Sequence, residues 1–169
     1  RPANSSRALL SGNGRIVVDA SLRRMLSSNY SIVSTRIEGQ KMTEPQKYAA
    51  EFRQIVKECK QFLLLTHYDP DGDALGSVCG LAYILRKMKK QVTIGLCEAY
   101  PARYEFLICD DGLRFQQQER VNFSKFDAVF VLDASTPDRL DKFEKDIRAL
   151  PPGSRLVNID HHADNTRYG

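Results

Sequence analysis

Two spacings of apolar residues alternate along the chain beyond residue 42, and together they predict helices that alternate with strands. In three segments the apolar side chains recur every three or four residues, the spacing of one helix face: 46–60, 74–89 and 137–150. Four short apolar runs are typical of strands: 62–66, 91–98, 126–132 and 155–159. Elements in this order predict an α/β fold, a doubly wound parallel sheet with helices on both faces.

Local signals predict where several of these elements begin and end. Thr43 suits the N-cap of the first helix, and Pro45 suits its first turn. The strand 62–66 is continuously apolar at Phe62-Leu63-Leu64-Leu65, which favours a parallel strand buried on both faces. Residues 101–109 predict a short helix or turn, and the Asp-Asp-Gly sequence at 110–112 is a turn signal.

Residues 1–41 differ in composition from the rest of the chain. The whole chain carries a net charge of +4, and this segment holds seven Lys or Arg against two Asp or Glu. It lacks a periodic apolar face, so we expect a leader or a disordered arm, followed by one folded domain over 42–169. The folded part then has a net charge of −1. That charge argues against a general basic surface for a long duplex and leaves room for a small anionic ligand.

The cysteines favour a reducing compartment. Cys59, Cys79, Cys97 and Cys109 are widely spaced, and no two of them form a C-x-x-C pair. The last three lie in apolar segments, so buried free thiols are expected rather than disulfides or zinc ligands. We therefore expect a cytoplasmic protein. No apolar run reaches the roughly 18 residues that cross a bilayer, so no membrane partner is expected.

The densest chemistry follows the strand 62–66. One imidazole and three carboxylates fall within seven residues, at His67, Asp69, Asp71 and Asp73. Adjacent carboxylates repel one another at pH 7, and a hard divalent cation with oxygen and imidazole ligands removes that repulsion. The simpler interpretation is an acidic turn in which Asp caps the next helix, but this explains only one or two of the four residues.

Two later strands end in similar clusters. Asp133 follows the strand 126–132, and Asp160-His161-His162 follows the strand 155–159. The carboxyl ends of parallel strands lie at one edge of a sheet, so these residues are expected to converge on the first cluster. Together they suffice for two divalent ions, which in phosphoester cleavage activate water and stabilise the leaving oxygen. Mixed imidazole and carboxylate ligands favour Mn²⁺ over Mg²⁺.

Each of these residues taken alone has a simpler interpretation. Asp133 could cap the next helix, His161 could be a hydrogen-bonded core histidine, and His162 could face solvent. Arg139 and Arg167 could each bind a phosphate through two N–H groups, or be ordinary surface arginines. Polar clusters at three strand ends favour the metal site over these separate explanations.

The three clusters carry a resemblance to a known family. The pattern His67-x-x-x-Asp71-x-Asp73-Ala-Leu-Gly-Ser77, then Asp133-Ala-Ser135 with Arg139, then Asp160-His161-His162-x-x-Asn165, resembles the DHH phosphoesterase superfamily. Within this superfamily, the sequence Pro-Asp-Gly-Asp-Ala-Leu-Gly-Ser at 70–77 is most similar to the oligoribonuclease (nanoRNase)/pAp phosphatase branch. The resemblance covers about residues 44–169, and it implies that these residues are the N-terminal DHH domain.

The resemblance implies a role for each motif residue. His67 and Asp71 would bind a first Mn²⁺, Asp73 and His161 a second, and Asp133 would bridge both ions, with Mg²⁺ or Co²⁺ as other candidates. His162 would contact the scissile phosphate, and Asp160 would orient the histidines. Four further residues would contact the substrate: Ser77, Ser135, Arg139 and Asn165.

The implied function is a metal-dependent phosphoesterase. It would hydrolyse short single-stranded RNA from an end to mononucleotides, and convert 3′-phosphoadenosine 5′-phosphate (pAp) to AMP. Two alternatives stay open: a cyclic-dinucleotide phosphodiesterase, and a non-catalytic nucleotide- or metal-binding remnant. The family pattern continues with a further Asp ligand and a DHHA1 domain, neither of which falls within these residues. We therefore expect weak or no activity from this chain alone. The resemblance also allows a homodimer of the full-length protein.

Overall fold

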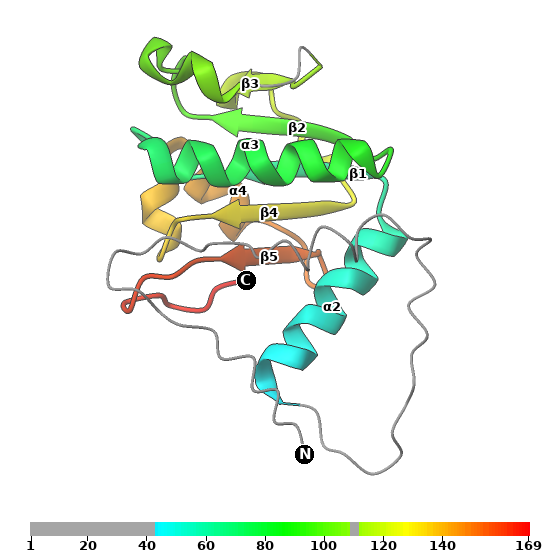
Figure 1. Ribbon diagram of the computed structural model, residues 1–169. Coiled ribbons are helices and arrows are strands. Elements are labelled where there is room, and N and C mark those ends of the chain that lie inside the picture. The colour runs from blue at the N-terminus through cyan, green and yellow to red at the C-terminus, as the bar shows by residue number, and fades with distance from the viewer. Residues whose placement is uncertain (1–42, 109–111) are drawn as a thin grey trace, which may run out of the picture. The chain divides into compact units, whose positions relative to one another are not determined.

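The computed structural model describes residues 43–108 and 112–169, and these build a five-stranded, all-parallel sheet (Figure 1). The strands stand in the order β3-β2-β1-β4-β5. Their bounds are β1 Gln61–Leu65, β2 Gln91–Leu96, β3 Phe115–Gln117, β4 Ala128–Leu132 and β5 Leu156–Ile159. The expected leader or arm at 1–41, the turn at 110–111 and Cys109 lie outside the described residues. Within the described residues, no helix is long and apolar enough to cross a membrane.

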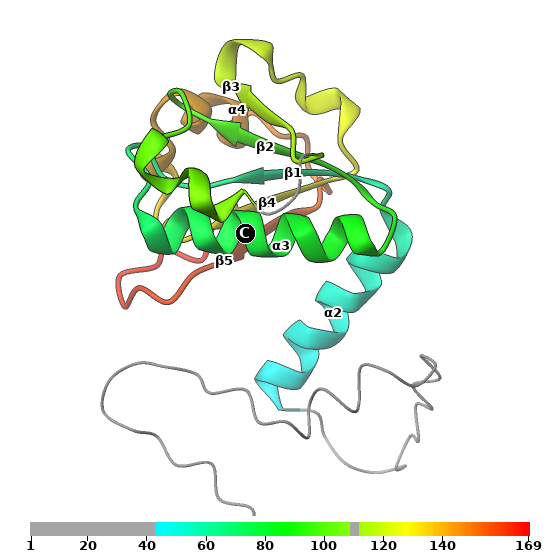
Figure 2. The ribbon, with the colours of Figure 1, turned by 45° about the horizontal axis from the view of Figure 1, so that its top comes forward.

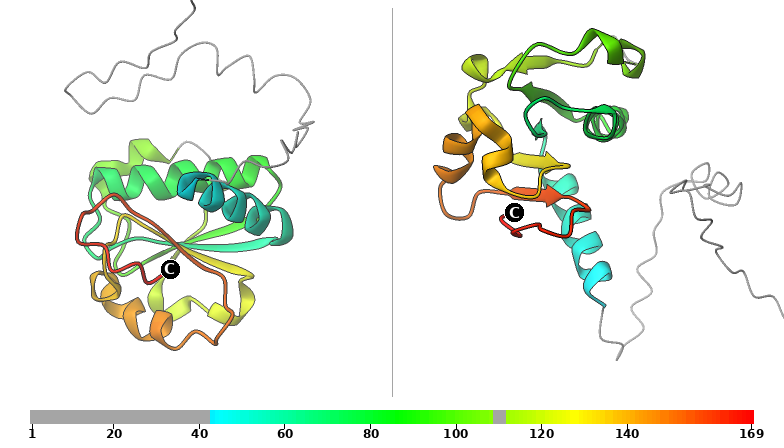
Figure 3. Two further views of the ribbon diagram at one scale, coloured as in Figure 1. Left: turned by 90° about the horizontal axis from the view of Figure 1, so that it is seen from below. Right: turned by 90° about the vertical axis from the view of Figure 1, so that its left-hand side faces the viewer.

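Helices cover both faces of the sheet, which confirms the predicted fold class (Figure 3). On one face lie α2, Glu44–Glu58, and α3, Gly72–Lys87, which runs along the strands (Figure 2). On the other face lie the 3₁₀ helix η4, Pro137–Phe143, and α4, Glu144–Arg148. Three shorter 3₁₀ helices lie in the connections: η1 Ala102–Leu107, η2 Gln118–Arg120 and η3 Phe123–Lys125.

The central strand is β1, and its apolar run explains its position. All of its residues from Phe62 to Leu65 are fully buried, alternate ones packing into the two separate cores of the molecule. Leu64 stands level with Ile94 of β2 on one side and with Phe130 of β4 on the other. A strand with neighbours and helices on every side must be apolar at every position, as the sequence is here.

The helix boundaries agree with the sequence signals to within about two residues. Thr43 is the N-cap of α2, as predicted, and its backbone N–H donates to the side chain of Gln46 at 2.9 Å. Leu140, Phe143 and Ile147 are buried, as the spacing predicts. Their segment is interrupted, however, because Asp141 has a non-helical backbone with φ 45° and ψ −108°.

The interruption at Asp141 coincides with contacts to the end of β2. The Sγ of buried Cys97 lies 3.2 Å from the carbonyl oxygen of Leu140, and Lys142 donates to the carbonyl of Cys97 at 3.1 Å. Lys142 also donates to Glu98 at 2.8 Å. The chain therefore bends here to contact β2 while keeping its apolar side chains inside.

Strand β3 is an addition that the sequence analysis does not predict. It has three residues, two of them Gln, and pairs only with β2 at the sheet edge. The pattern is too short and too polar to indicate a strand. Its single contribution to a core is Phe115, which packs against Tyr100 with ring centroids 4.8 Å apart.

Asp127 offers a test of how the two central strands are joined. Its Oδ2 accepts hydrogen bonds from the backbone N–H groups of Lys60 at 2.8 Å and Gln61 at 2.9 Å, and these lower its pKa. We expect Asp127→Ala to lower the free energy of unfolding at pH 7 by about 1 kcal/mol. Asp127→Asn, which keeps an acceptor oxygen, should cost less.

The effect should depend on pH in a defined direction. A carboxyl whose pKa is lowered by folding stabilises above its unfolded pKa of about 3.9, and that stability is lost as pH falls through the folded value. Denaturant unfolding of both proteins at pH 7 and pH 3 measures this. A difference between wild type and Asp127→Ala that stays the same at both pH values would contradict the assignment.

Candidate metal centre

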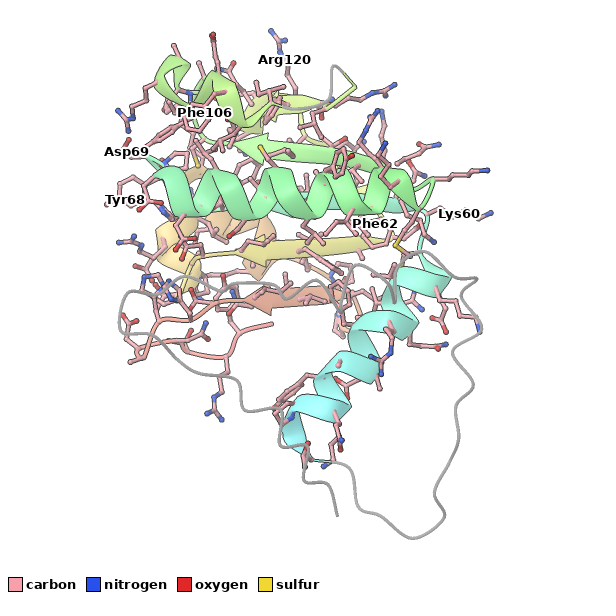
Figure 4. All side chains as sticks on the ribbon, in the orientation of Figure 1. Lys60, Phe62, Tyr68, Asp69, Phe106 and Arg120 are labelled. Carbon is pink, nitrogen blue, oxygen red and sulfur yellow. The ribbon has the colours of Figure 1, made fainter. Side chains whose placement is uncertain are left out.

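The motif residues gather at the carboxyl edge of the sheet. His67 comes two residues after β1, Asp133 directly after β4 and Asp160 directly after β5. The register aligns Leu65 with Val131, and Leu132 with Ile159, so the three strands end level with one another. In Figure 4 Tyr68 and Asp69 mark this edge, and Lys60 marks the opposite one.

Strand order explains why the cluster forms between β1 and β4. The chain leaves β1 through α3 to reach β2, whereas β4 pairs on the other side of β1. Connections that diverge in this way leave a crevice at the carboxyl ends, where open α/β sheets bind their ligands.

One group of potential metal ligands consists of His67, Asp71 and Asp133. Each offers one ligand atom, and these atoms all lie within 4.8 Å of one another. The Nδ1 of His67 lies 2.6 Å from the carbonyl oxygen of Tyr68, and Nε2 lies 3.9 Å from Oδ2 of Asp133. If Nδ1–H donates to that carbonyl, Nε2 is left with the lone pair that a metal needs.

Asp71 also caps α3, as the simpler interpretation of the acidic turn expects. Its Oδ1 accepts from the N–H groups of Ala74 at 3.1 Å and Asp73 at 3.0 Å. The bond from Ala74 has the largest effect on its pKa, which lies below the ordinary value despite partial desolvation. Asp71 is therefore ionised at neutral pH, and capping and metal binding are compatible because a carboxylate has several lone pairs.

A second group consists of Asp133, His161 and His162, again with one ligand atom each within 4.8 Å of the others. The Nε2 of His161 lies 3.4 Å from Oδ1 of Asp133 and 3.7 Å from Oδ2 of Asp73. The Nδ1 of His162 lies 3.6 Å from the same Asp133 oxygen. Asp133 is therefore common to both groups, and Asp73 borders the second.

Asp133 is in an unusual state for a carboxylate. Its side chain is 9% exposed, and its backbone has a φ of 57°. Its Oδ1 is buried and accepts no hydrogen bond within the described part of the chain, a condition it shares with the hydroxyl of Thr66. A buried carboxylate oxygen without a donor is costly. A bound cation would remove that cost, so the residues present fit a metal.

Asp160 holds His162 in place. Its Oδ1 lies 2.7 Å from Nδ1 of His162, and its Oδ2 accepts from the amide of Asn165 at 2.7 Å. Burial acts to raise the pKa of Asp160, but the hydrogen bonds from His162 and Asn165 outweigh it, and the pKa is lowered. The pKa of His162 is raised, chiefly by its hydrogen bond to Asp160.

Asn158 is a structural residue of this site that the sequence analysis misses. Its Nδ2 donates to the carbonyl oxygen of Ala134 at 3.1 Å, and its Oδ1 accepts from Asn165 at 2.6 Å. The hydroxyl of Tyr168 donates to the same carbonyl at 3.0 Å, and burial raises the pKa of that phenol. Asn158 thus ties the loop after β5 to the end of β4. A polar residue inside an otherwise apolar strand is the signal that could have identified it.

The four predicted substrate contacts lie outside the two ligand groups. Ser77 is half-buried on α3, and Ser135 is buried, its carbonyl accepting from Thr166 at 2.9 Å. Arg139 is exposed, and its guanidinium carbon lies 5.8 Å from the ring centroid of Tyr68. The carbonyl of Arg139 accepts from the N–H of Tyr68 at 2.9 Å. Asn165 uses its amide within the protein, as described above.

Comparison with known proteins identifies the family of this chain. Residues 61–168 match the family model described as the DHH family, N-terminal domain. Two curated proteins named bifunctional oligoribonuclease and PAP phosphatase NrnA are similar. The one from Bacillus subtilis is 31% identical over 107 residues, covering 63% of this chain and 31% of that protein. The one from Thermus thermophilus is 30% identical over 112 residues, covering 63% of this chain and 29% of that protein.

A solved structure supports the fold. An exopolyphosphatase-related protein from Bacteroides fragilis matches with a TM-score of 0.62 and 23% identity, over 75% of this chain and 38% of that protein. The chain spans about a third of the length of the curated relatives that it matches. Since the family model matches more than half of the chain, the protein belongs to the DHH family and contains its N-terminal domain.

Proposed function

We propose that this domain is the metal-binding part of a phosphoesterase that uses two Mn²⁺ ions to hydrolyse short oligoribonucleotides from an end, and pAp to AMP. The observation that carries the proposal is Asp133, a buried carboxylate shared by both groups of potential ligands, one oxygen of which accepts no hydrogen bond and lies 3.4 Å from His161 Nε2 and 3.6 Å from His162 Nδ1. Two ions joined by a carboxylate are the arrangement that phosphoester hydrolysis uses.

The ligand set supports the choice of metal. Carboxylates and imidazoles together suit Mn²⁺ better than Mg²⁺, which prefers oxygen ligands and retained water. His67 and Asp71 would hold the first ion, Asp73 and His161 the second, and Asp133 both. When bound, such ions supply the positive charge that activates water and stabilises the leaving oxygen.

His162 would act on the substrate rather than on the metal. Asp160 engages its Nδ1 and raises its pKa, so the imidazolium form persists to higher pH than in a free histidine. An imidazolium cannot bind a metal but can donate a hydrogen bond to a phosphate oxygen or a proton to a leaving alkoxide. Asp160, held in turn by Asn165, keeps the ring oriented.

The substrate proposal rests on two observations: the names of the two relatives, and the polar side chains near this edge of the sheet. The two NrnA proteins are named for oligoribonucleotides and PAP. Arg139 would hold a substrate phosphate through its paired N–H groups, with Ser77 and Ser135 lining the approach. Asn165 would contribute through Asp160. Buried thiols at Cys59 and Cys97, which form no disulfide within the described residues, support a reducing, cytoplasmic location.

Metal binding is the first test. Mn²⁺ should raise the melting temperature of wild type, since a ligand at 100 times its Kd stabilises by about 2.7 kcal/mol. Asp133→Asn keeps the shape of the side chain but leaves one oxygen atom, instead of two, that can bind a metal. This variant should lose most of the increase in melting temperature. Glu51→Gln, the same charge change on an exposed face of α2, is the control. Equal Mn²⁺ stabilisation of Asp133→Asn and wild type would refute the shared role.

The ionisation of His162 is the second test. In metal-free protein, Asp160→Asn should lower the pKa of His162 toward about 6.5, because it removes the main acceptor that stabilises the imidazolium. Asp164→Asn, a weaker influence, should lower it less. An NMR titration of the ring protons measures both. The proposed role fails if Asp160→Asn leaves the pKa unchanged.

Catalysis is the third test, measured on the 169-residue chain and on the full gene product. From the full gene product we expect Mn²⁺-dependent release of mononucleotides from a five-nucleotide RNA, and of phosphate from pAp, and from the 169-residue chain weak or no turnover. His162→Ala should lower kcat at least 100-fold while Mn²⁺ binding persists. Arg139→Ala should raise KM, whereas Arg53→Ala on α2 should not. Faster hydrolysis of a cyclic dinucleotide than of short RNA would favour the phosphodiesterase alternative, and metal-independent turnover would contradict the mechanism.

A further inference from the structure

A groove of about 590 Å³ lies at the opposite edge of the sheet from the metal centre. Its lining includes Gln61 and Gln91, the first residues of β1 and β2, and Phe126 and Arg114, which precede β4 and β3. Figure 4 marks this edge by Lys60, where β1 begins. The groove therefore shares no residue with the cluster at the carboxyl ends of the strands.

The charge of the groove is one-sided. Five of its lining residues are cationic, and none of its lining residues among those the structure describes is Asp or Glu. The cations come from the end of α3, from the start of β3 and from the segment before β4: Arg86, Lys90, Arg114, Arg120 and Lys125. Like charges in a concave site repel one another and concentrate a positive potential. A bound polyanion would relieve that repulsion.

One of these cations, Lys90, is held in place by an uncharged acceptor. Its Nζ donates to the carbonyl oxygen of Cys59 at 2.7 Å. A carbonyl acceptor orients a cation but does not neutralise its charge. By contrast, Arg155 and Arg148 elsewhere in the molecule pair with glutamates.

No ion pair joins Arg114, Arg120 or Lys125 to an acid within the described residues. The nearest acid along the chain to Lys125 is Asp127, and its carboxylate accepts from the N–H groups of Lys60 and Gln61. It does not line the groove. Three cationic side chains are thus available to an incoming anion.

The sheet contributes polar side chains to the groove. In β2, Ile94 is buried in one core, whereas the half-buried Thr93 lines the groove together with the buried Val92. In β3, Phe115 packs into the same core and Gln116 lines the groove. Alternate residues of a strand point to opposite faces. This face thus presents a hydroxyl and an amide where an apolar cover would need aliphatic side chains.

We propose that this groove is a second ligand site, which binds a small, multiply charged phosphate anion. Its volume is in the range of small-molecule sites, and its Arg and Lys side chains supply the charge-assisted hydrogen bonds that phosphate oxygens accept. The chemistry is shared by a bare phosphate chain and by the phosphodiester backbone of a short oligonucleotide. The site needs no metal and stands independently of the function proposed for the other edge.

Calorimetric titration of the metal-free 169-residue chain tests the site. Inorganic tripolyphosphate is one probe, and the dinucleotide 5′-pApA is the other. The double variant Arg114→Gln/Lys125→Gln should bind both probes at least tenfold more weakly than wild type. Its affinity should also fall less steeply with salt, by about one unit of the log–log slope for each lost cation. Tighter binding of 5′-pApA would identify an oligonucleotide site, and tighter binding of tripolyphosphate a phosphate-chain site.

The matched control is Arg53→Gln/Lys145→Gln, which removes the same charge from exposed positions on α2 and α4. It should bind like wild type. Amide NMR shifts in wild type give a second readout that needs no variant: Thr93 and Gln116 should move on titration. No binding by wild type, equal affinity of the groove and control variants, or shifts confined to residues 160–165 would each overturn the proposal.

Discussion

Parallel pairing of β1 with both of its neighbours is the constraint on which the molecule depends. Because β2 and β4 both run parallel to β1, every connection must return along a face of the sheet, and helices cover those faces. The same parallel pairing brings the carboxyl ends of all the strands to one edge of the sheet. Residues separated by almost a hundred positions, such as His67 and His161, meet there without any direct interaction between their own strands.

The carboxyl edge holds a carboxylate in an uncommon state. Asp133 is nearly buried, its Oδ1 accepts no hydrogen bond within the described residues, and its backbone has a positive φ. Residues in such states persist only where surrounding structure holds them. Here that structure is the end of β4, whose five residues are all buried, and the backbone hydrogen bond from Asp133 to Ile159 at 3.0 Å.

The sequence predicted those parts of the fold that depend on strong local patterns. The continuously apolar run at Phe62–Leu65 favours a strand buried on both faces. The meeting of the three strand-end clusters follows from the parallel topology. Edge strand β3 was not predicted, because one neighbour and a glutamine-rich sequence give it no apolar signature. The non-helical backbone at Asp141 and the hydrogen bond from Asn158 to Ala134 depend on partners distant in sequence, so no local pattern could predict them.

Tyr68 connects two parts of the carboxyl edge through its backbone. Its N–H donates to the carbonyl of Arg139, and its C=O accepts from the ring of His67. The proposed metal ligand His67 and the proposed phosphate ligand Arg139 are therefore joined by two hydrogen bonds through one residue. A change in the backbone of Tyr68 would alter both of these hydrogen bonds, even though the Tyr68 side chain is assigned to neither ligand group.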